Sequence, residues 1–94
     1  MSMDITIPLE AKLKYIERRK KDFESCDAAI KNQDYKFFQK IGHDLKGNAI
    51  TFGFAPLSTL GEKLETAANK SDIELLKTLV KSYGDYLKSV KVTA

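Results

Sequence analysis

The residues of this chain best suited to chemistry surround its single histidine, His43, with Lys46 and Gly47 following it three and four positions on. Apolar residues recur through the same stretch with the three-and-four spacing that marks one side of a helix, at Phe37, Phe38, Ile41, Leu45, Ala49 and Phe52. At about 100° per residue, His43 falls on the opposite side of that helix. We therefore expect its imidazole to face water, flanked by Lys46 and Gly47 one turn on and by Ile50 two turns on.

Gly47 is the least expected residue on this exposed side. Glycine inside a helix costs about 1 kcal/mol relative to alanine, and no core contact explains it there. An imidazole, a cation one turn away, a missing side chain and the exposed Ile50 fit a place where a phosphoryl group is accepted and another protein comes close. The sequence therefore predicts a functional site on the outer face of this helix.

This run resembles the signature of histidine-containing phosphotransfer (HPt) domains, H-x-L-K-G followed by a second glycine ten residues after the histidine. The matching positions are His43, Leu45, Lys46, Gly47 and Gly53, and the resemblance extends through Phe54, Leu57, Leu60 and Lys63-Leu64-Glu65. Two positions depart from the family. Gly42 stands where alanine is common, and Asp44 stands where a small polar or basic residue is common.

The resemblance implies a phosphorelay intermediate. A ring nitrogen of His43 would attack the phosphoryl group of a phospho-aspartate on a receiver domain and later pass it to another aspartate, while Lys46 stabilises the phosphoryl charge. Gln39, Lys40, Gly47 and Ile50 would form the docking face. The partners would be receiver domains of response regulators or hybrid sensor kinases.

The resemblance also places Mg²⁺ on the receiver. We therefore expect no cofactor or metal on this chain and no kinase activity of its own. A single histidine without a nearby cysteine offers no convergent metal-ligand set.

Three other functions remain open. The segment Thr51-Phe52-Gly53-Phe54 also resembles the phosphotransfer module of a larger histidine kinase, of the hybrid or chemotaxis type. A non-phosphorylated helical adaptor is disfavoured because His43, Lys46 and Gly47 are all present. A nucleic-acid-binding bundle is suggested by the tract at 18–21, but its cations spread around most of a helix, so we expect no nucleic acid partner.

Composition sets the fold class and the compartment. The 94 residues suit one domain, 1–94, and carry 16 Lys and Arg against 13 Asp and Glu. The absence of period-two alternation predicts an all-α fold. No apolar run is long enough for a membrane span, and the start Met1-Ser2-Met3-Asp4 lacks the plan of a secretion signal. The single cysteine, Cys26, fits a reducing compartment, so we expect the protein in the cytoplasm. We also expect a monomer that does not contact a membrane.

Four helices are predicted. The first runs from about Pro8 to Lys31. Its apolar residues follow an alternating four-and-three repeat, with polar interruptions at Lys20 and Asp27. The apolar positions of this repeat are Leu9, Leu13, Ile16, Phe23 and Ile30. The second is capped by Asp34, begins at Tyr35, carries His43 and ends near Gly53.

The third helix starts at Pro56 and turns Leu57, Leu60, Leu64 and Ala67 or Ala68 inward, with Gly61 at a close approach between helices. A capping box from Ser71 to Glu74 opens the fourth. Its inward set is Ile73, Leu76, Leu79 or Val80, Tyr83, Leu87 and Val90. Four helices joined by short connections predict an antiparallel up-and-down bundle with His43 exposed on the second helix.

Overall fold

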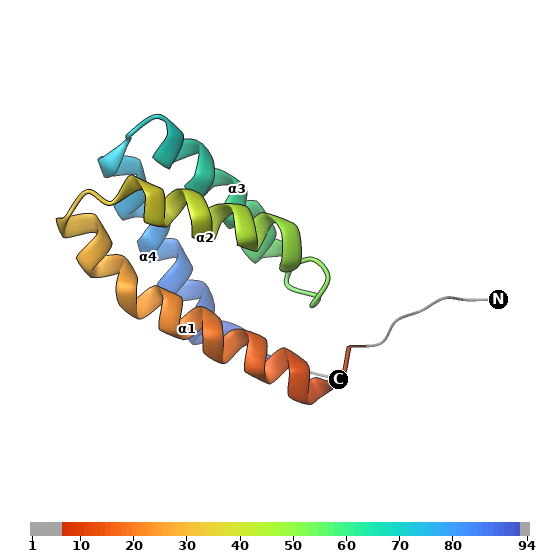
Figure 1. The fold of residues 1–94 in the computed structure, drawn as a ribbon. Helices are drawn as coiled ribbons and strands as arrows, with labels where there is room; N and C mark the ends of the chain where they lie inside the picture. Colours follow the sequence, from red (N-terminus) through yellow and green to blue (C-terminus); the bar gives the residue numbers. More distant parts are fainter. Residues whose placement is uncertain (1–6, 93–94) are drawn as a thin grey trace.

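The computed structural model describes residues 7–92, and in that range it contains four α-helices and no strand (Figure 1). The helices are α1 (Leu9–Lys31), α2 (Tyr35–Asn48), α3 (Ala55–Asn69) and α4 (Ile73–Ser89). Packing joins α1 to α2, α2 to α3, α3 to α4 and α4 to α1, which confirms the all-α four-helix bundle. The start of the chain, on which the expected lack of a secretion signal depends, lies outside the described residues.

Local signals explain most helix starts. The Asp34 side chain accepts a hydrogen bond of 3.1 Å from the Phe37 N–H, which confirms it as the cap of α2. Pro56 lies in the first turn of α3, as predicted.

The predicted capping box of α4 is wrong. Ser71 has a φ of +54° and belongs to the turn that closes α3, where its N–H donates to the Ala68 carbonyl over 3.0 Å. Asp72 is therefore the residue before the helix, and its carboxylate accepts from the Leu75 N–H over 3.1 Å.

The end of α2 also differs from the prediction. Gly53 adopts the left-handed conformation, with φ +90°, but α2 stops at Asn48 and residues 49–53 form tight turns. Those turns bring Phe52 and Phe54 onto the Tyr15 ring of α1, with ring centroids 4.4 and 5.7 Å apart. The stacking of Phe52 and Phe54 on Tyr15 therefore takes the place of a further turn of α2 after Asn48.

The core face of α1 is not the predicted one. Tyr15, Ile16, Cys26 and Ala29 are buried, whereas Leu9 and Leu13 are 40% and 47% exposed. Of the predicted stripe, Ile16 alone is buried, and Phe23 and Ile30 are half-buried. The helix is rotated so that Tyr15 and Cys26 face the centre. Burial raises the pKa of the Cys26 thiol to about 12.

The predicted inward residues of α3 are all buried, as are Leu76, Leu79, Tyr83 and Leu87 of α4.

Two glycines set the separation of α2 and α3. A Cβ on Gly61 would lie 2.6 Å from the Leu45 Cβ and 2.7 Å from the Gly42 carbonyl oxygen. A Cβ on Gly42 would lie 2.6 Å from the Gly61 carbonyl oxygen. The predicted close approach at Gly61 is therefore confirmed, and Gly42 is its counterpart on α2.

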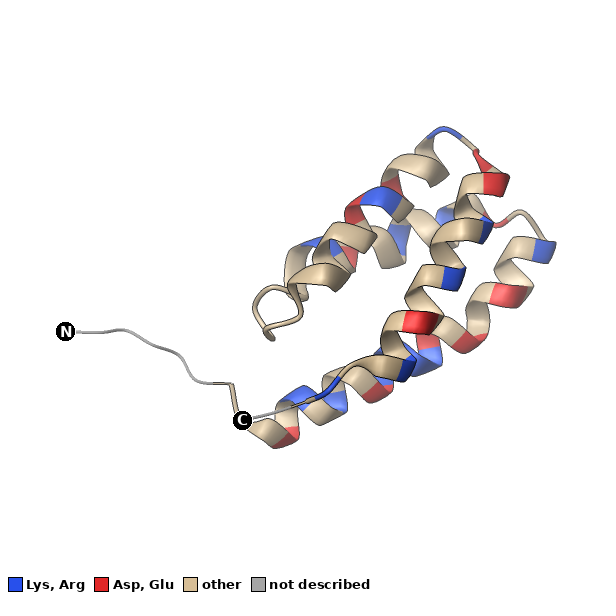
Figure 2. Cartoon of the chain, turned by 180° about the vertical axis from the view of Figure 1, so that it is seen from behind, with Lys and Arg blue, Asp and Glu red and all other residues tan. Residues whose placement is uncertain are grey.

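Charge is divided unevenly along the bundle. Residues 9–22 of α1 hold six Lys and Arg against three Asp and Glu, and residues 81–92, which lie alongside them, hold three Lys against one Asp. Residues 23–80 hold seven Lys against eight Asp and Glu. The net positive charge of the described residues therefore gathers at one end of α1 and α4 (Figure 2). None of the described helices has the length and hydropathy that crossing a bilayer requires.

Candidate functional site

His43 lies on the outer side of α2, where its side chain is 74% exposed. Ile41 and Leu45, two positions away on either side, are both buried in the core. The placement follows from the 3.6-residue period, because a residue between two inward positions on a helix must turn outward. The imidazole is therefore open to another molecule.

A second helix supplies a partner for this ring. The His43 Nδ1 lies 3.1 Å from Oε2 of Glu65 on α3, whose side chain is 24% exposed. The Lys46 Nζ lies 4.0 Å from the other oxygen of the same carboxylate, Oε1. One carboxylate from α3 thus joins the histidine and the lysine of α2.

Glu65 was not among the predicted site residues. Its position follows from Gly61, which lies four residues earlier and therefore on the same side of α3. Since Gly61 was predicted to face a neighbouring helix, the next turn of that face had to meet the same helix. That signal would have found Glu65, provided that the neighbour was known to be α2.

The carboxylate determines which ring nitrogen is available. An ionised carboxylate only accepts hydrogen bonds, so the Nδ1 that contacts Glu65 carries the proton. In the neutral ring, Nε2 then holds the lone pair and is the nucleophilic atom. The site therefore holds an oriented imidazole with an available Nε2, a cation nearby and an anion behind Nδ1.

The space beside His43 is open at Gly47. A Cβ placed on this residue would meet nothing within 4 Å. No packing or backbone requirement explains the glycine, in contrast to Gly42 and Gly61. A larger side chain here would project into solvent one turn from the imidazole.

The backbone under Lys46 is fixed from α3. Ser58 is buried, and its hydroxyl donates a hydrogen bond of 3.0 Å to the Lys46 carbonyl oxygen. At the end of α2, the Tyr15 hydroxyl of α1 donates to the Asn48 side-chain oxygen. These bonds hold the segment that carries His43 from two sides of the bundle.

The other predicted docking residues lie around this segment. Ile50 is 64% exposed, although it belongs to the turn after α2 and not to the helix. Lys40 pairs with Asp44 over 3.4 Å, and Gln39 is half-buried. The described part of the chain contains no group of three His, Cys, Asp or Glu side chains that could hold a metal ion.

Comparison with known families gives a match to the model described as Hpt domain over residues 13–89. The match spans all of α2, α3 and α4 and most of α1. Comparison with curated proteins and with solved structures gave no match.

Proposed function

Because this chain belongs to the Hpt domain family, we propose that His43 carries a phosphoryl group between aspartates of receiver domains. Membership of the family implies a phosphotransfer role in a phosphorelay. The observation that carries the assignment to His43 is its exposed ring, with Nδ1 held 3.1 Å from the Glu65 carboxylate. Receiver domains of response regulators or hybrid sensor kinases are the proposed partners.

The proposed reaction is an in-line displacement at phosphorus. The Nε2 lone pair attacks the phosphoryl group of the phospho-aspartate, the N–P bond forms, and the bond from phosphorus to the aspartate oxygen breaks. The aspartate leaves as a carboxylate. Transfer to the next receiver reverses these steps with a different aspartate.

This chain would contribute orientation and charge. As Nε2 bonds to phosphorus, positive charge develops on the ring, and the Glu65 carboxylate at Nδ1 stabilises that charge. Lys46 would interact with the phosphoryl oxygens. The open space at Gly47 would admit the receiver, and the exposed Ile50 would contact it, with Lys40 and Gln39 on the preceding turn.

The Mg²⁺ that phosphoryl transfer requires would come with the receiver. We propose an intermediate carrier without kinase activity of its own. A phosphotransfer module of a larger histidine kinase, of the hybrid or chemotaxis type, would use the same residues and is the alternative to a separate carrier protein.

Transfer from a labelled receiver tests the proposal. A receiver phosphorylated with ³²P should pass its label to this chain as an acid-labile, base-stable phosphoramidate, and His43→Gln should remove all labelling. The same substitution should change the free energy of unfolding by no more than about 0.5 kcal/mol, because the side chain lies outside the core. Equal labelling of the substituted protein would refute the proposal, and an absence of labelling from every receiver tried would favour the adaptor.

A further inference from the structure

The exposed Ile50 is presented by a turn whose backbone is closed by hydrogen bonds. The Ile50 carbonyl oxygen accepts a bond of 2.9 Å from the Gly53 N–H. The Ala49 carbonyl oxygen accepts one of 2.8 Å from the Phe54 N–H. Gly53 supplies the left-handed conformation, with φ +90°, in which this closure is made. The position of the Ile50 side chain therefore depends on the backbone of the turn and on the contacts that hold that backbone to the bundle.

A single residue of α1, Tyr15, contacts both ends of this turn. The Tyr15 ring stacks on Phe52 and Phe54, with interplanar angles of 16° and 6°. Its hydroxyl donates a hydrogen bond to the side-chain oxygen of Asn48, the last residue of α2. These contacts lie before and after Ile50 in the sequence. The place of the turn on the bundle is therefore fixed from α1, a helix that does not carry His43.

Tyr15 is itself held in place by its neighbours on α1. The guanidinium carbon of Arg19 lies 4.8 Å from the centre of the Tyr15 ring, as in a cation–π contact. The Arg19 Nε lies 3.0 Å from Oδ2 of Asp22, and the Arg19 side chain is only 14% exposed. Burial raises the pKa of the Tyr15 hydroxyl, so the group stays protonated and can donate to Asn48 at neutral pH. The ring and the hydroxyl therefore hold the turn in a defined place.

From these contacts we infer that Tyr15 is a positioning residue for docking, which fixes the turn at 49–53 so that Ile50 meets a receiver domain in one orientation. The inference rests on the proposed function, in which Ile50 contacts the receiver, and it adds α1 to the elements that determine docking. Tyr15 is buried and acts through Asn48 and Phe52 instead of touching the receiver. A loop that is ordered before it binds avoids the entropic cost of becoming ordered on binding. Loss of the Tyr15 contacts should therefore weaken docking without changing the chemistry at His43.

Tyr15→Phe tests the inference, because it keeps the stacked ring and removes the hydroxyl that bonds to Asn48. Hydrogen exchange of the Gly53 and Phe54 amides should become at least about threefold faster, since the turn opens more often. In single-turnover transfer from a phosphorylated receiver domain with Mg²⁺, the receiver concentration for half-saturation should rise by about threefold to tenfold, the range that one hydrogen bond accounts for. The maximum rate of transfer should stay the same. The rate at which phosphoramidate phosphorylates His43 should also stay the same.

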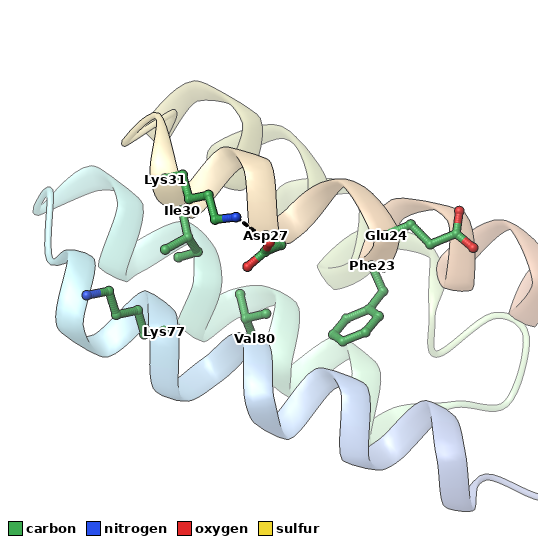
Figure 3. Close-up of a pocket in the computed structure, with 7 residues that line it drawn as sticks. All are labelled: Phe23, Glu24, Asp27, Ile30, Lys31, Lys77 and Val80. Atoms are coloured by element: carbon green, nitrogen blue, oxygen red, sulfur yellow. Dashed lines mark ion pairs between the residues drawn. The ribbon is translucent and has the colours of Figure 1, made fainter.

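Tyr83→Phe is the matched control, since it removes a tyrosine hydroxyl at the contact between α1 and α4 instead of at the turn. The Tyr83 hydroxyl donates over 3.1 Å to the Arg19 carbonyl oxygen. Its ring packs edge-on against Phe23, with centroids 5.8 Å apart, and Figure 3 shows Phe23 in the groove between α1 and α4. Urea unfolding compares the stabilities of the two variants. Tyr83→Phe should change neither the amide exchange of Gly53 nor the half-saturation by the receiver.

Asn48→Ala removes the acceptor of the same hydrogen bond. When Tyr15→Phe is added to Asn48→Ala, the half-saturation should not rise further, because the bond is already lost. A further rise would show that Tyr15 does not act through Asn48 and overturns the inference.

The remaining outcomes are equally direct. Unchanged amide exchange or unchanged half-saturation in Tyr15→Phe overturns the inference. Slower phosphorylation by phosphoramidate in that variant also overturns it, because the effect would then lie at His43 instead of at the turn. Failure of the proposed function is distinguishable, because the original chain would then take no label from any receiver, and the docking role of Tyr15 would be overturned with it.

Discussion

The contact between Glu65 and His43 gives an exposed side chain a defined orientation. An imidazole that is 74% exposed would otherwise sample several rotamers and both tautomers. A carboxylate from a different helix fixes the ring without covering Nε2. The reactive atom can therefore be open to a partner and still point in one direction.

Glu65→Gln should slow transfer from a phosphorylated receiver by about tenfold. The amide can either accept from or donate to Nδ1, so it no longer selects one tautomer and no longer stabilises charge on the ring. Nitrogen NMR of His43 should show a mixture of tautomers in the variant and the Nδ1-protonated form in the original protein. Glu62→Gln, an exposed neighbour on α3, is the control and should change neither measurement. An unchanged tautomer and an unchanged rate would remove Glu65 from the site.

Lys46→Ala should slow transfer by roughly tenfold or more and leave the fold intact. The Nζ lies 4.0 Å from the Glu65 carboxylate, which also contacts the His43 ring, so its charge would act on a phosphoryl group bound to that ring. Single-turnover kinetics with a labelled receiver measure the effect. Lys63→Ala, an exposed lysine on α3, should transfer at the original rate. If the Lys46→Ala protein transfers the phosphoryl group at the rate of the original protein, Lys46 has no role in transfer.

Gly47→Gln should raise the melting temperature and block transfer. A Cβ at Gly47 meets no neighbour, so the change adds helix propensity of up to about 1 kcal/mol without a packing cost. The longer side chain then occupies the space through which a receiver must approach. Thermal unfolding and labelled transfer are the two measurements. A protein that is both more stable and fully active would show that the space is not needed.

The helix pair α2–α3 is the element that assembles the site. Gly42 and Gly61 let the backbones approach, and the Ser58 hydroxyl donates to the Lys46 carbonyl oxygen across the contact. Glu65 lies one turn beyond Gly61 and therefore reaches His43. The separation of the two helices sets the distance between Nδ1 and the carboxylate.

Gly61→Ala should destabilise the bundle by about 1–3 kcal/mol, because the added Cβ would lie 2.7 Å from a carbonyl oxygen that cannot move alone. Urea unfolding measures the loss. Gly47→Ala is a matched control on the neighbouring helix, and it should be neutral or stabilising by up to about 1 kcal/mol. If the free energy of unfolding rises in both variants, α2 and α3 can accommodate a Cβ at Gly61, and the glycine contact does not set their separation.

The helix period was enough to predict the exposure of His43, the buried face of α2 and the close approach at Gly61. The helix period was not enough where a contact with a residue far away in the sequence determines the end of a helix or its buried face. Tyr15 stacks on Phe52 and Phe54 and so ends α2 before Gly53, which no local signal announces. Two apolar stripes compete on α1, and the choice between Tyr15 and Leu13 depends on the shape of the other three helices. To predict Glu65 as a site residue, one would have had to know that α3 packs against α2.

Across the whole bundle, the candidate site and the net positive charge lie on different helices. The imidazole and its carboxylate lie on α2 and α3, whereas the net positive charge lies on α1 and α4. The turn at 49–53 connects the two regions, with the Lys12 side chain 3.8 Å from the position of a Cβ on Gly53. An anionic partner approaching the cationic end would meet this turn, and its rate of association would fall as salt rises.

Ile50→Asp should weaken receiver binding by at least tenfold and barely change thermal stability. The side chain is 64% exposed in the turn, so it contributes little to folding, whereas burial under a receiver would contribute about 1.5–3 kcal/mol. Calorimetry with a receiver measures binding. Thr51→Asp, an adjacent exposed change of equal charge, controls for electrostatics.

Phosphorylation of the Ile50→Asp protein by phosphoramidate should proceed at the original rate, since His43 itself is untouched. Equal slowing with phosphoramidate and with the receiver would mean that the turn shapes the histidine site instead of docking a partner.

Because the glycine contact between α2 and α3 brings Glu65 to His43, the orientation of the His43 ring depends on the folded state. A peptide that spans α2 alone keeps His43, Lys46 and Gly47 but has no carboxylate at Nδ1, and a nascent or partly unfolded chain is in the same position. Such a chain presents an ordinary histidine, with neither a selected tautomer nor a docking turn. On the proposed function, the smallest unit that holds an oriented acceptor is therefore the helical hairpin of α2 and α3, and the selected tautomer of His43 is a property that the chain acquires when it folds.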